Sequence, residues 1–250
     1  MGSQGNNAWQ EQIPEDQWRV YQRVIRQARD RDVPIALGGA FCNAHYTGRW
    51  RNTKDLDLYV LPKDRDRMIE AITRAGLEDY FDVNPYDRGW IYRAHSGESL
   101  VDAIWAMANR RAYVDERWIW CGAEADLRGE RLRVVPAEEM IWDKLYILQR
   151  DRCDWPDVLN LIYATGATLD WPHLLERMGD DTALLAGLLS VYAWLSPDGA
   201  RVLPEWVWRQ LKLPSPVETC SSATCRFRTE LLDTRPWFET DFERTRTESG

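Results

Sequence analysis

The spacing of apolar residues changes at Pro136, and this change constrains the fold more than any other feature of the chain. Before it, short apolar runs bounded by glycine and proline mix with helical spacings, as in a chain that alternates strands and helices. After it, apolar residues recur every three or four positions from Met140 to Leu195, as in successive amphipathic helices. The pattern predicts an α/β domain followed by a C-terminal helical domain.

The 250 residues are enough for two small domains that share a cleft. We divide them into a disordered tail or cloning remnant (1–13), an α/β domain (14–135), a helical domain (136–213) and an extended or partly disordered tail (214–250). Within the α/β domain the expected strands are Val33–Leu37, Leu56–Leu61, Tyr80–Val83, Gly89–Ala94, Ser99–Met107, and a pair formed by Trp118–Cys121 and Arg131–Val135.

Charge and hydropathy exclude several classes of protein. No apolar run approaches the ~20 residues of a membrane helix, and the polar N-terminus lacks the features of a signal peptide. We therefore expect a soluble, cytoplasmic protein with no membrane partner. The net charge of −8 lacks the overall basic character of proteins that grip nucleic acid mainly through phosphates, so any nucleic acid would have to meet a local basic patch.

Cysteine and histidine give no sign of a zinc site. The five cysteines contain no Cys-x-x-Cys pair, and the three histidines are scattered. Cys220 and Cys225 stand close enough in sequence to bridge, but in a cytoplasmic protein we expect them to be reduced thiols, and we assign them no function.

The segment Asp55–Val60 alternates polar and apolar residues, as in a half-buried strand. Asp55 and Asp57 would then point to one face, and Leu56 and Leu58 into the core. Two neighbouring carboxylates repel each other unless a cation lies between them, and Mg²⁺ favours one or two carboxylates together with substrate phosphates. The spacing therefore suggests a site for metal and triphosphate together, whereas a bare Asp-x-Asp without further context is more often a plain, solvated strand end.

Gly38 and Gly39 strengthen this interpretation because they follow a predicted strand and open a predicted helix. Such a turn presents backbone amides and the positive end of a helix to an anion. Arg51, Thr53 and Lys54 add cationic and hydroxyl donors just before the acidic pair. A phosphate chain bound at the glycine turn would thus lie beside the two carboxylates.

Read together, Gly38-Gly39-Ala40 and Arg51-Asn52-Thr53-Lys54-Asp55-Leu56-Asp57 resemble the motif of the DNA polymerase beta-like nucleotidyltransferase superfamily. Within it, the chain looks most like the bacterial abortive-infection (AbiEii-type) nucleotidyltransferases. The resemblance implies a mixed sheet with flanking helices, two Mg²⁺ ions (Mn²⁺ being an alternative) and an NTP donor such as ATP. It also implies a third carboxylate on a later strand, where Asp102 fits, so that Asp55, Asp57 and Asp102 are the predicted catalytic and metal-binding residues.

The resemblance extends to the helical part, where it places Lys144 against the nucleotide phosphates. Asp154 and Asp157 are expected to cap and brace the next helix. Ala40 stands where relatives often carry Ser or Thr, so the predicted nucleotide contacts are the backbone of Gly38 and Gly39 and the side chains of Arg51, Thr53 and Lys144.

Two functions stay open at this point. The first is an EC 2.7.7-type transferase that moves an NMP from an NTP to an acceptor hydroxyl of tRNA, protein or a small molecule, with release of pyrophosphate. The second is a catalytically silent nucleotide-binding or toxin-like regulatory module that acts through a protein partner, such as an antitoxin. The presence of all three expected carboxylates favours the enzyme.

Overall fold

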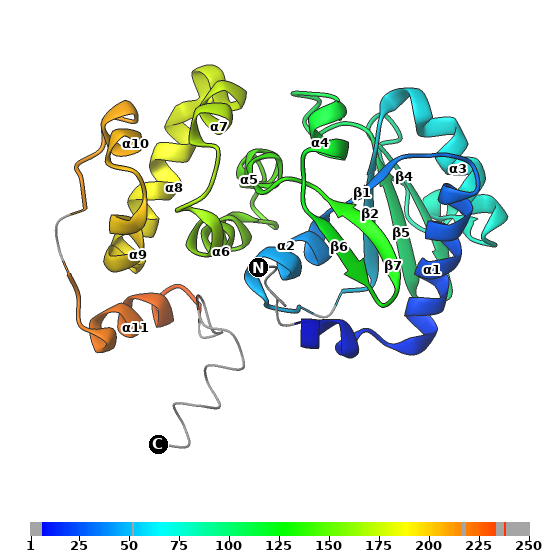
Figure 1. Cartoon of the computed structure of the whole chain (residues 1–250), viewed down its shortest axis with the longest axis horizontal. Coiled ribbons are helices and arrows are strands. Elements are labelled where there is room, and N and C mark those ends of the chain that lie inside the picture. The colour runs from blue at the N-terminus through cyan, green and yellow to red at the C-terminus, as the bar shows by residue number, and fades with distance from the viewer. Residues whose placement is uncertain (1–6, 52, 217–218, 234–237, 239–250) are drawn as a thin grey trace. The chain divides into compact units, whose positions relative to one another are not determined.

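The computed structural model describes residues 7–51, 53–216, 219–233 and 238. The chain divides into two compact units, unit 1 (Met1–Pro136) and unit 2 (Ala137–Gly250). Unit 1 contains the strands, and helices make up most of unit 2, so the predicted α/β fold with C-terminal helices is confirmed (Figure 1).

Unit 1 alternates short helices and strands. Its helices are η1 (Asn7–Gln12), α1 (Glu15–Arg29), α2 (Gly39–Thr47), η2 (Pro62–Asp64), α3 (Arg65–Arg74), η3 (Tyr80–Asp82) and α4 (Glu116–Trp120), where η marks a 3₁₀ helix. Its strands are β1 (Ile35–Leu37), β2 (Asp55–Val60), β3 (Glu78–Asp79), β4 (Ile91–Ser96), β5 (Ser99–Ile104), β6 (Glu124–Leu127) and β7 (Glu130–Val134).

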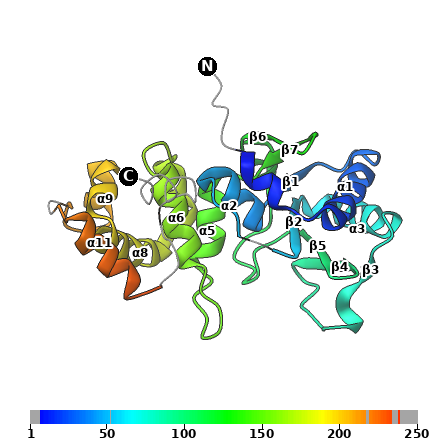
Figure 2. The same ribbon diagram turned by 90° about the horizontal axis from the view of Figure 1, so that it is seen from below.

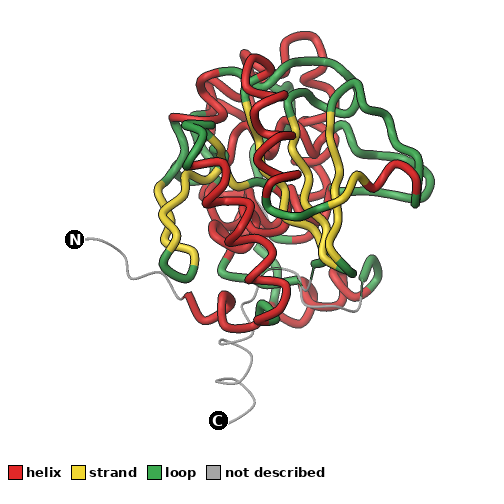
Figure 3. Tube along the Cα trace, turned by 90° about the vertical axis from the view of Figure 1, so that its right-hand side faces the viewer, coloured by secondary structure: helices red, strands yellow, loops and turns green. Residues whose placement is uncertain are grey.

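Within the described residues these seven strands form one mixed sheet in the order β3-β4-β5-β2-β1-β7-β6. The strands are drawn in yellow in Figure 3. The pairs β2–β5 and β1–β7 are parallel, and the other neighbouring pairs are antiparallel. Strand β2 therefore lies at the centre, with β5 on one side and β1 on the other.

One face of the sheet is covered by α1 and α3 (Figure 1). The apolar residues of β2, Leu56 and Leu58, are fully buried in this core with Val101 and Ala103 of β5. The helices contribute Trp18, Tyr21, Val24, Ile25 and Ala28 from α1 and Met68, Ala71 and Ile72 from α3. Because side chains alternate along a strand, the residues between these apolar positions face the other side of the sheet.

Helices α2 and α4 contact the sheet at β2. The ring of Tyr59, in the C-terminal half of β2, stacks on Trp118 of α4 with their centroids 5.2 Å apart. Tyr59 has the same parity as Asp55 and Asp57, so α4 packs against the face that carries the aspartates. This leaves the first half of β2 to present Asp55 and Asp57.

Two of the expected strands are wrong. Residues Tyr80–Asp82 form the 3₁₀ helix η3, because the carboxylate of Asp79 accepts a hydrogen bond from the Phe81 amide at 2.9 Å and turns the chain. The residues expected as strand Trp118–Cys121 fall largely in α4, whose first turn is capped by Asp115 accepting from the Arg117 amide at 2.9 Å. The antiparallel partner of β7 is β6.

The N-terminal segment also differs from the expectation of a disordered tail. Trp9 and Ile13 are buried in the core of unit 1, and Trp9 stacks on Trp50 with a centroid distance of 5.4 Å. Gln10 Nε2 donates to the carbonyl of Asp126 at 2.8 Å, which ties η1 to β6. Residues 1–6 lie outside the described part of the chain.

Unit 2 is built on helices, several of which are seen in Figure 2. They are α5 (Ala137–Leu145), α6 (Trp155–Thr165), α7 (Trp171–Met178), η4 (Gly179–Asp181), α8 (Thr182–Leu195), α9 (Pro197–Val202), α10 (Glu205–Gln210) and α11 (Ser222–Glu230). Helix α8 is central and buries Leu185, Leu188, Leu189, Tyr192 and Leu195. In the part of the chain that the structure describes, no helix has the length and apolar character needed to cross a bilayer. A cytoplasmic location stays a prediction.

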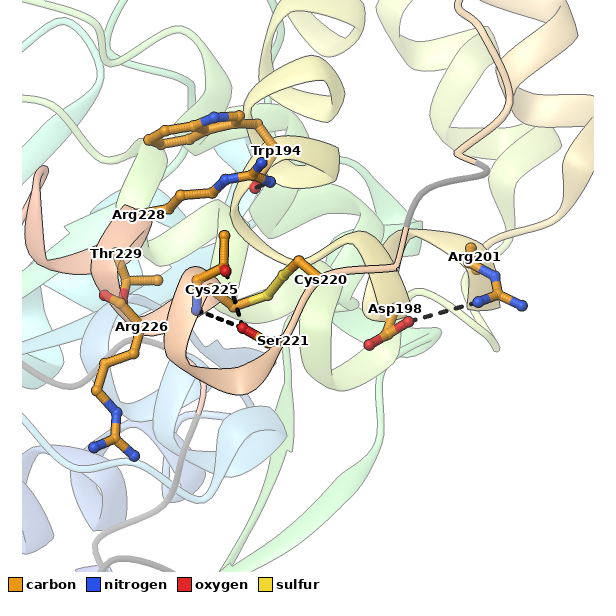
Figure 4. Close-up of a disulfide and its surroundings, with 10 residues drawn as sticks. Trp194, Asp198, Arg201, Cys220, Ser221, Cys225, Arg226, Arg228 and Thr229 are labelled. Atoms are coloured by element: carbon orange, nitrogen blue, oxygen red, sulfur yellow. Dashed lines mark hydrogen bonds and ion pairs between the residues drawn. A yellow bond between two sulfur atoms is a disulfide. The ribbon is translucent and has the colours of Figure 1, made fainter.

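The C-terminal segment contains a helix and a disulfide that the sequence interpretation did not expect. Cys220 and Cys225 are bonded to each other, so the expectation of reduced thiols is wrong (Figure 4). The first turn of α11 brings their Cα atoms to 6.2 Å, and Ser221 caps this turn by accepting from the Thr224 amide at 3.1 Å. Arg228 Nη1 donates to the carbonyl of Trp194 at 2.8 Å, which holds α11 against α8. Residues 217–218, 234–237 and 239–250 of the predicted tail lie outside the described residues.

Candidate active site

Strand β2 places Asp55 and Asp57 on one face of the sheet. Leu56 and Leu58, which alternate with them, have no exposed surface, whereas both aspartates are partly exposed. The burial of the leucines fixes the orientation of the strand, because a shift of register by one residue would move the aspartates into the core. The two carboxylates are thus held side by side by the packing of the opposite face.

Strand β5 brings Asp102 to the same place. In the parallel pairing of β2 with β5, Asp102 lies opposite Asp57, and Leu100 lies opposite Asp55. Neighbouring strands are about 4.8 Å apart, and paired residues point to the same face. The structure therefore brings the three predicted acids together, with Asp102 almost fully buried at 1% exposure.

The double glycine lies directly against this group. Gly38 precedes α2, and Gly39, its first residue, has a φ of +52°, a left-handed conformation that favours glycine. A Cβ atom on Gly39 would lie 1.6 Å from Oδ2 of Asp57, and one on Gly38 would lie 2.2 Å from the ring of Tyr59. The first turn of α2 thus approaches the Asp57 carboxylate closely. Any side chain at position 39 would clash with this carboxylate.

Thr53 connects the segment before β2 to the first aspartate. Its hydroxyl donates to Oδ1 of Asp55, and its carbonyl accepts from Gln17 Nε2 at 2.6 Å. Lys54 is exposed and pairs with Glu98 at 2.8 Å. Arg51 is exposed on the same segment, and Asn52 between them lies outside the described residues. The roles of Arg51 and Thr53 in nucleotide binding stay predictions.

Arg93 on β4 is a member of this group that the sequence interpretation missed. It lies opposite Asp102 in the antiparallel pairing of β4 with β5, and its Nε donates to Oδ1 of Asp102 at 2.8 Å. Its Nη2 donates to Oδ2, so the guanidinium binds both oxygens. Arg93 lies within the expected strand Gly89–Ala94. However, the sequence carries no signal for the strand register that places Arg93 opposite Asp102.

The shared charge of the three acids reaches their neighbours. The pKa of Arg93 is raised, mainly by its hydrogen bonds to Asp102 and against the effect of burial, with further contributions from Asp55 and Asp57. The pKa of Tyr21 on α1 is raised chiefly by burial and also by the three aspartates. Asp55, Asp57 and Asp102 therefore all act electrostatically on Arg93 and on Tyr21.

Lys144, the predicted phosphate contact of the helical part, belongs to unit 2. Its Nζ donates to Asp154 at 2.7 Å and to Asp157 at 2.9 Å, and the residue is only 5% exposed. Burial acts to lower the pKa of Lys144, but Asp157 and Asp154 outweigh it and raise the pKa. The expected cap of α6 is wrong, since Asp154 precedes this helix but makes no side-chain capping hydrogen bond, and both aspartates bind Lys144 of α5. The contact of Lys144 with phosphates stays a prediction.

The donor chemistry at Asp55 and Asp57 fits a hard divalent cation, because Mg²⁺ is typically held by one or two carboxylates and by substrate oxygens. Asp102 differs, since both of its oxygens are bound by Arg93. Among the described residues, no three His, Cys, Asp or Glu side chains are arranged as a ready metal cluster. The assignment of Asp102 as a metal ligand stays a prediction.

Comparison with known proteins adds a set of structural similarities. No protein-family model and no curated protein sequence matches the chain. Ten or more solved chains are similar to it. They include the antibiotic-resistance factor ANT(2'')-Ia (19% identity, TM-score 0.47, covering 68% of this chain and 92% of that chain) and the lincosamide antibiotic adenylyltransferase LnuA bound to lincomycin (15%, 0.43, 60% and 96%). JHP933 from Helicobacter pylori is also similar (13%, 0.39, 95% and 100%). All three TM-scores lie below 0.5.

Proposed function

We propose that this chain is a Mg²⁺-dependent nucleotidyltransferase that moves an NMP from an NTP to an acceptor hydroxyl. The observation that supports the proposal most is the meeting of Asp55, Asp57 and Asp102 on adjacent strands, directly against the first turn of α2 at Gly39. Carboxylates for a divalent cation and the backbone at the start of α2 for an anion thus lie side by side, as the transfer of a phosphate-containing group requires. The Gly38 amide is not one of the anion donors, because it donates to the Asp57 carbonyl at 2.9 Å.

In the reaction, the acceptor oxygen bonds to the α-phosphorus of the NTP, the bond from that phosphorus to the β-phosphate bridging oxygen breaks, and pyrophosphate leaves with those electrons. The acceptor hydroxyl loses its proton, which Asp102 would take up as a general base. Asp55 and Asp57 would hold Mg²⁺ against the triphosphate, and the bound ion would supply charge neutralisation for the pyrophosphate. Gly38 and Gly39 would leave room for the phosphates, while Asp102 would act on the acceptor hydroxyl. Arg51 and Thr53 are the further proposed nucleotide contacts in unit 1.

The acceptor is proposed only as a class: a hydroxyl of tRNA, of a protein or of a small molecule. ANT(2'')-Ia has been crystallised with adenylyl-2''-tobramycin and LnuA with lincomycin, both small molecules. The net charge of −8 disfavours a large RNA unless basic residues gather at one mouth of the site.

The experiment combines the protein with each labelled NTP, Mg²⁺, and separate pools of tRNA, protein and small hydroxylated antibiotics, and follows the label. We expect label in one pool with the wild type. Asp57→Asn should lose this labelling, whereas Asp66→Asn, the same change on the exposed surface of α3, should keep it. A wild-type protein that binds NTP and labels no pool would instead support the second function, a silent nucleotide-binding module that acts through a protein partner such as an antitoxin. The pairing of Arg93 with Asp102 is the observation that favours this alternative.

A further inference from the structure

Arg93 binds Asp102 through both arms of its guanidinium, in the middle of two paired strands. The contact of Nε with Oδ1 is 2.8 Å, and Nη2 binds Oδ2. Such a two-point contact is the strongest arrangement that arginine makes with a carboxylate. Both oxygens through which Asp102 would bind a cation thus already face a positive group.

The two partners differ in exposure. The side chain of Asp102 is 2% exposed and that of Arg93 is 29% exposed. A carboxylate as buried as Asp102 needs a positive partner, because an isolated buried charge is strongly disfavoured. The partly exposed guanidinium can leave toward solvent at far lower cost than the carboxylate can.

The backbone of Arg93 is fixed independently of its side chain. The Arg93 amide donates to Oη of Tyr86 at 3.1 Å, and the hydroxyl of Tyr86 lies 3.2 Å from the Arg93 carbonyl and 3.0 Å from Oδ1 of Asp79. Strand β4 therefore stays in register whether or not the guanidinium holds Asp102. Release of Asp102 by Arg93 would require rotation of one side chain only.

We propose that Arg93 is a positioning residue that competes with a divalent cation for Asp102. The proposal rests on the proposed function, in which Asp55 and Asp57 hold one cation. While Arg93 binds Asp102, it satisfies the buried carboxylate and repels a second cation from it. A cation reaches Asp102 only when the guanidinium leaves, so Arg93 sets the affinity of that second position.

Cation binding without nucleotide tests the proposal directly. Mn²⁺ is titrated into the full chain and its free concentration is followed by electron paramagnetic resonance. Two Mn²⁺ ions are expected to bind, a tighter one at Asp55 and Asp57 and a weaker one at Asp102. We expect Arg93→Gln to bind the weaker ion at least about tenfold more tightly than wild type, since the substitution removes a competing charge that acts at close range. Arg93→Lys should fall between the two, because lysine keeps the charge and loses the two-point contact.

Three controls separate this effect from others. Arg93→Gln combined with Asp102→Asn should return to the wild-type isotherm, because the carboxylate that gains the cation is gone. Arg88 lies on the loop before β4 and pairs with Asp79 at 2.6 Å. Arg88→Gln should leave the Mn²⁺ isotherm unchanged. Asp57→Asn should lower the affinity for the tighter Mn²⁺, the ion held by Asp55 and Asp57. Circular dichroism shows which variants are folded, and Arg93→Lys provides the test if Arg93→Gln is not.

The outcomes are distinct. If Asp57→Asn weakens Mn²⁺ binding while folded Arg93→Gln and Arg93→Lys follow the wild-type isotherm, the inference about Arg93 is overturned and the metal site of the proposed function stands. An equal gain in Arg88→Gln would also overturn the inference, since net charge would then explain it. If no protein in the series binds Mn²⁺, both the inference and the proposed metal site fall.

Discussion

Two of the buried charge clusters, one in each unit, are built differently. In unit 2, Lys144 lies between Asp154 and Asp157, and Arg152 Nε binds the other oxygen of Asp154 at 3.0 Å. These residues all lie within one short stretch of chain. In unit 1, Asp55, Asp57 and Asp102 come together from two strands, with Arg93 from a third.

The difference indicates what each cluster is for. In unit 2 each of the two carboxylates binds Lys144, so the group braces the start of α6. In unit 1 three carboxylates from two strands share one face of the sheet, and the arginine that pairs with Asp102 comes from a third strand. Charged groups gathered on one face from distant parts of the chain are candidates for a functional site, whereas charge matching within one short stretch is typical of a structural cluster.

The largest effect that separates the clusters is expected from Asp57→Asn. The transfer rate should fall at least ~10²-fold, as when a preorganised electrostatic group is removed from an active site. The free energy of unfolding should change by less than the loss of a buried ion pair would cause, because Asp57 is partly exposed. Steady-state transfer and urea unfolding measure the two quantities. A variant that turns over at the wild-type rate under saturating Mg²⁺ would remove Asp57 from the site.

Asp102→Asn should act next most strongly, and on a different quantity. The affinity for Mg²⁺ and NTP should persist, because Asp55 and Asp57 remain, whereas the single-turnover rate with prebound donor should fall ~10²–10⁴-fold, as for loss of a positioned base. Asparagine keeps one oxygen that can accept from Arg93. A rate within about threefold of wild type, far short of the general-base effect, would show that Asp102 only pairs with Arg93.

These two residues also show how far sequence reasoning reached into the site. Asp55 and Asp57 follow from local alternation with Leu56 and Leu58, so their shared face could be predicted. Asp102 came from the family resemblance, since nothing local fixes the pairing of β5 with β2. Arg93 was missed because the antiparallel register of β4 and β5, which sets it against Asp102, depends on the packing of the whole sheet.

The fold shows the same contrast between local patterns, which could be predicted, and long-range contacts, which could not. The change of periodicity at Pro136 predicted the boundary region at which the structure divides, after Pro136. By contrast, the predictions at Tyr80–Val83 and Trp118–Cys121 failed because the Asp79 and Asp115 side chains cap turns there, which outweighs the β propensity of the aromatic residues. The burial of Trp9 depends on Trp50, far along the chain, and no local pattern reports it.

Lys144→Met tests the structural cluster and should affect stability more than activity. It leaves Asp154 and Asp157 without their shared lysine, and loss of one partner from a buried ion pair costs about 3–5 kcal/mol. Hydrogen exchange in α5 and α6 should increase accordingly, whereas NTP affinity measured by calorimetry at low temperature should stay close to wild type. The reverse result, unchanged exchange with a large loss of NTP affinity, would instead support Lys144 as a phosphate contact.

The smallest effect is expected in the acid dependence of unit 2. Burial acts to raise the pKa of Asp154, but Arg152 and Lys144 outweigh it and hold the pKa below the ordinary value of 3.8. The unfolded chain therefore binds this proton more readily than the folded chain, so the stabilisation is complete above the ordinary value and is lost as the pH falls through the lowered one. As the pH falls below about 4, Asp154 should contribute at most about 1.4 kcal/mol per pH unit to the slope of stability. Asp154→Asn should flatten this slope, as followed by hydrogen exchange in α6.

Glu98 is the matched control. Its pKa is also lowered, by Lys54, but at an exposed site. Glu98→Gln should therefore leave the slope of unit 2 unchanged. An equal slope in wild type and Asp154→Asn would show that the cluster around Lys144 does not stabilise unit 2 through charge.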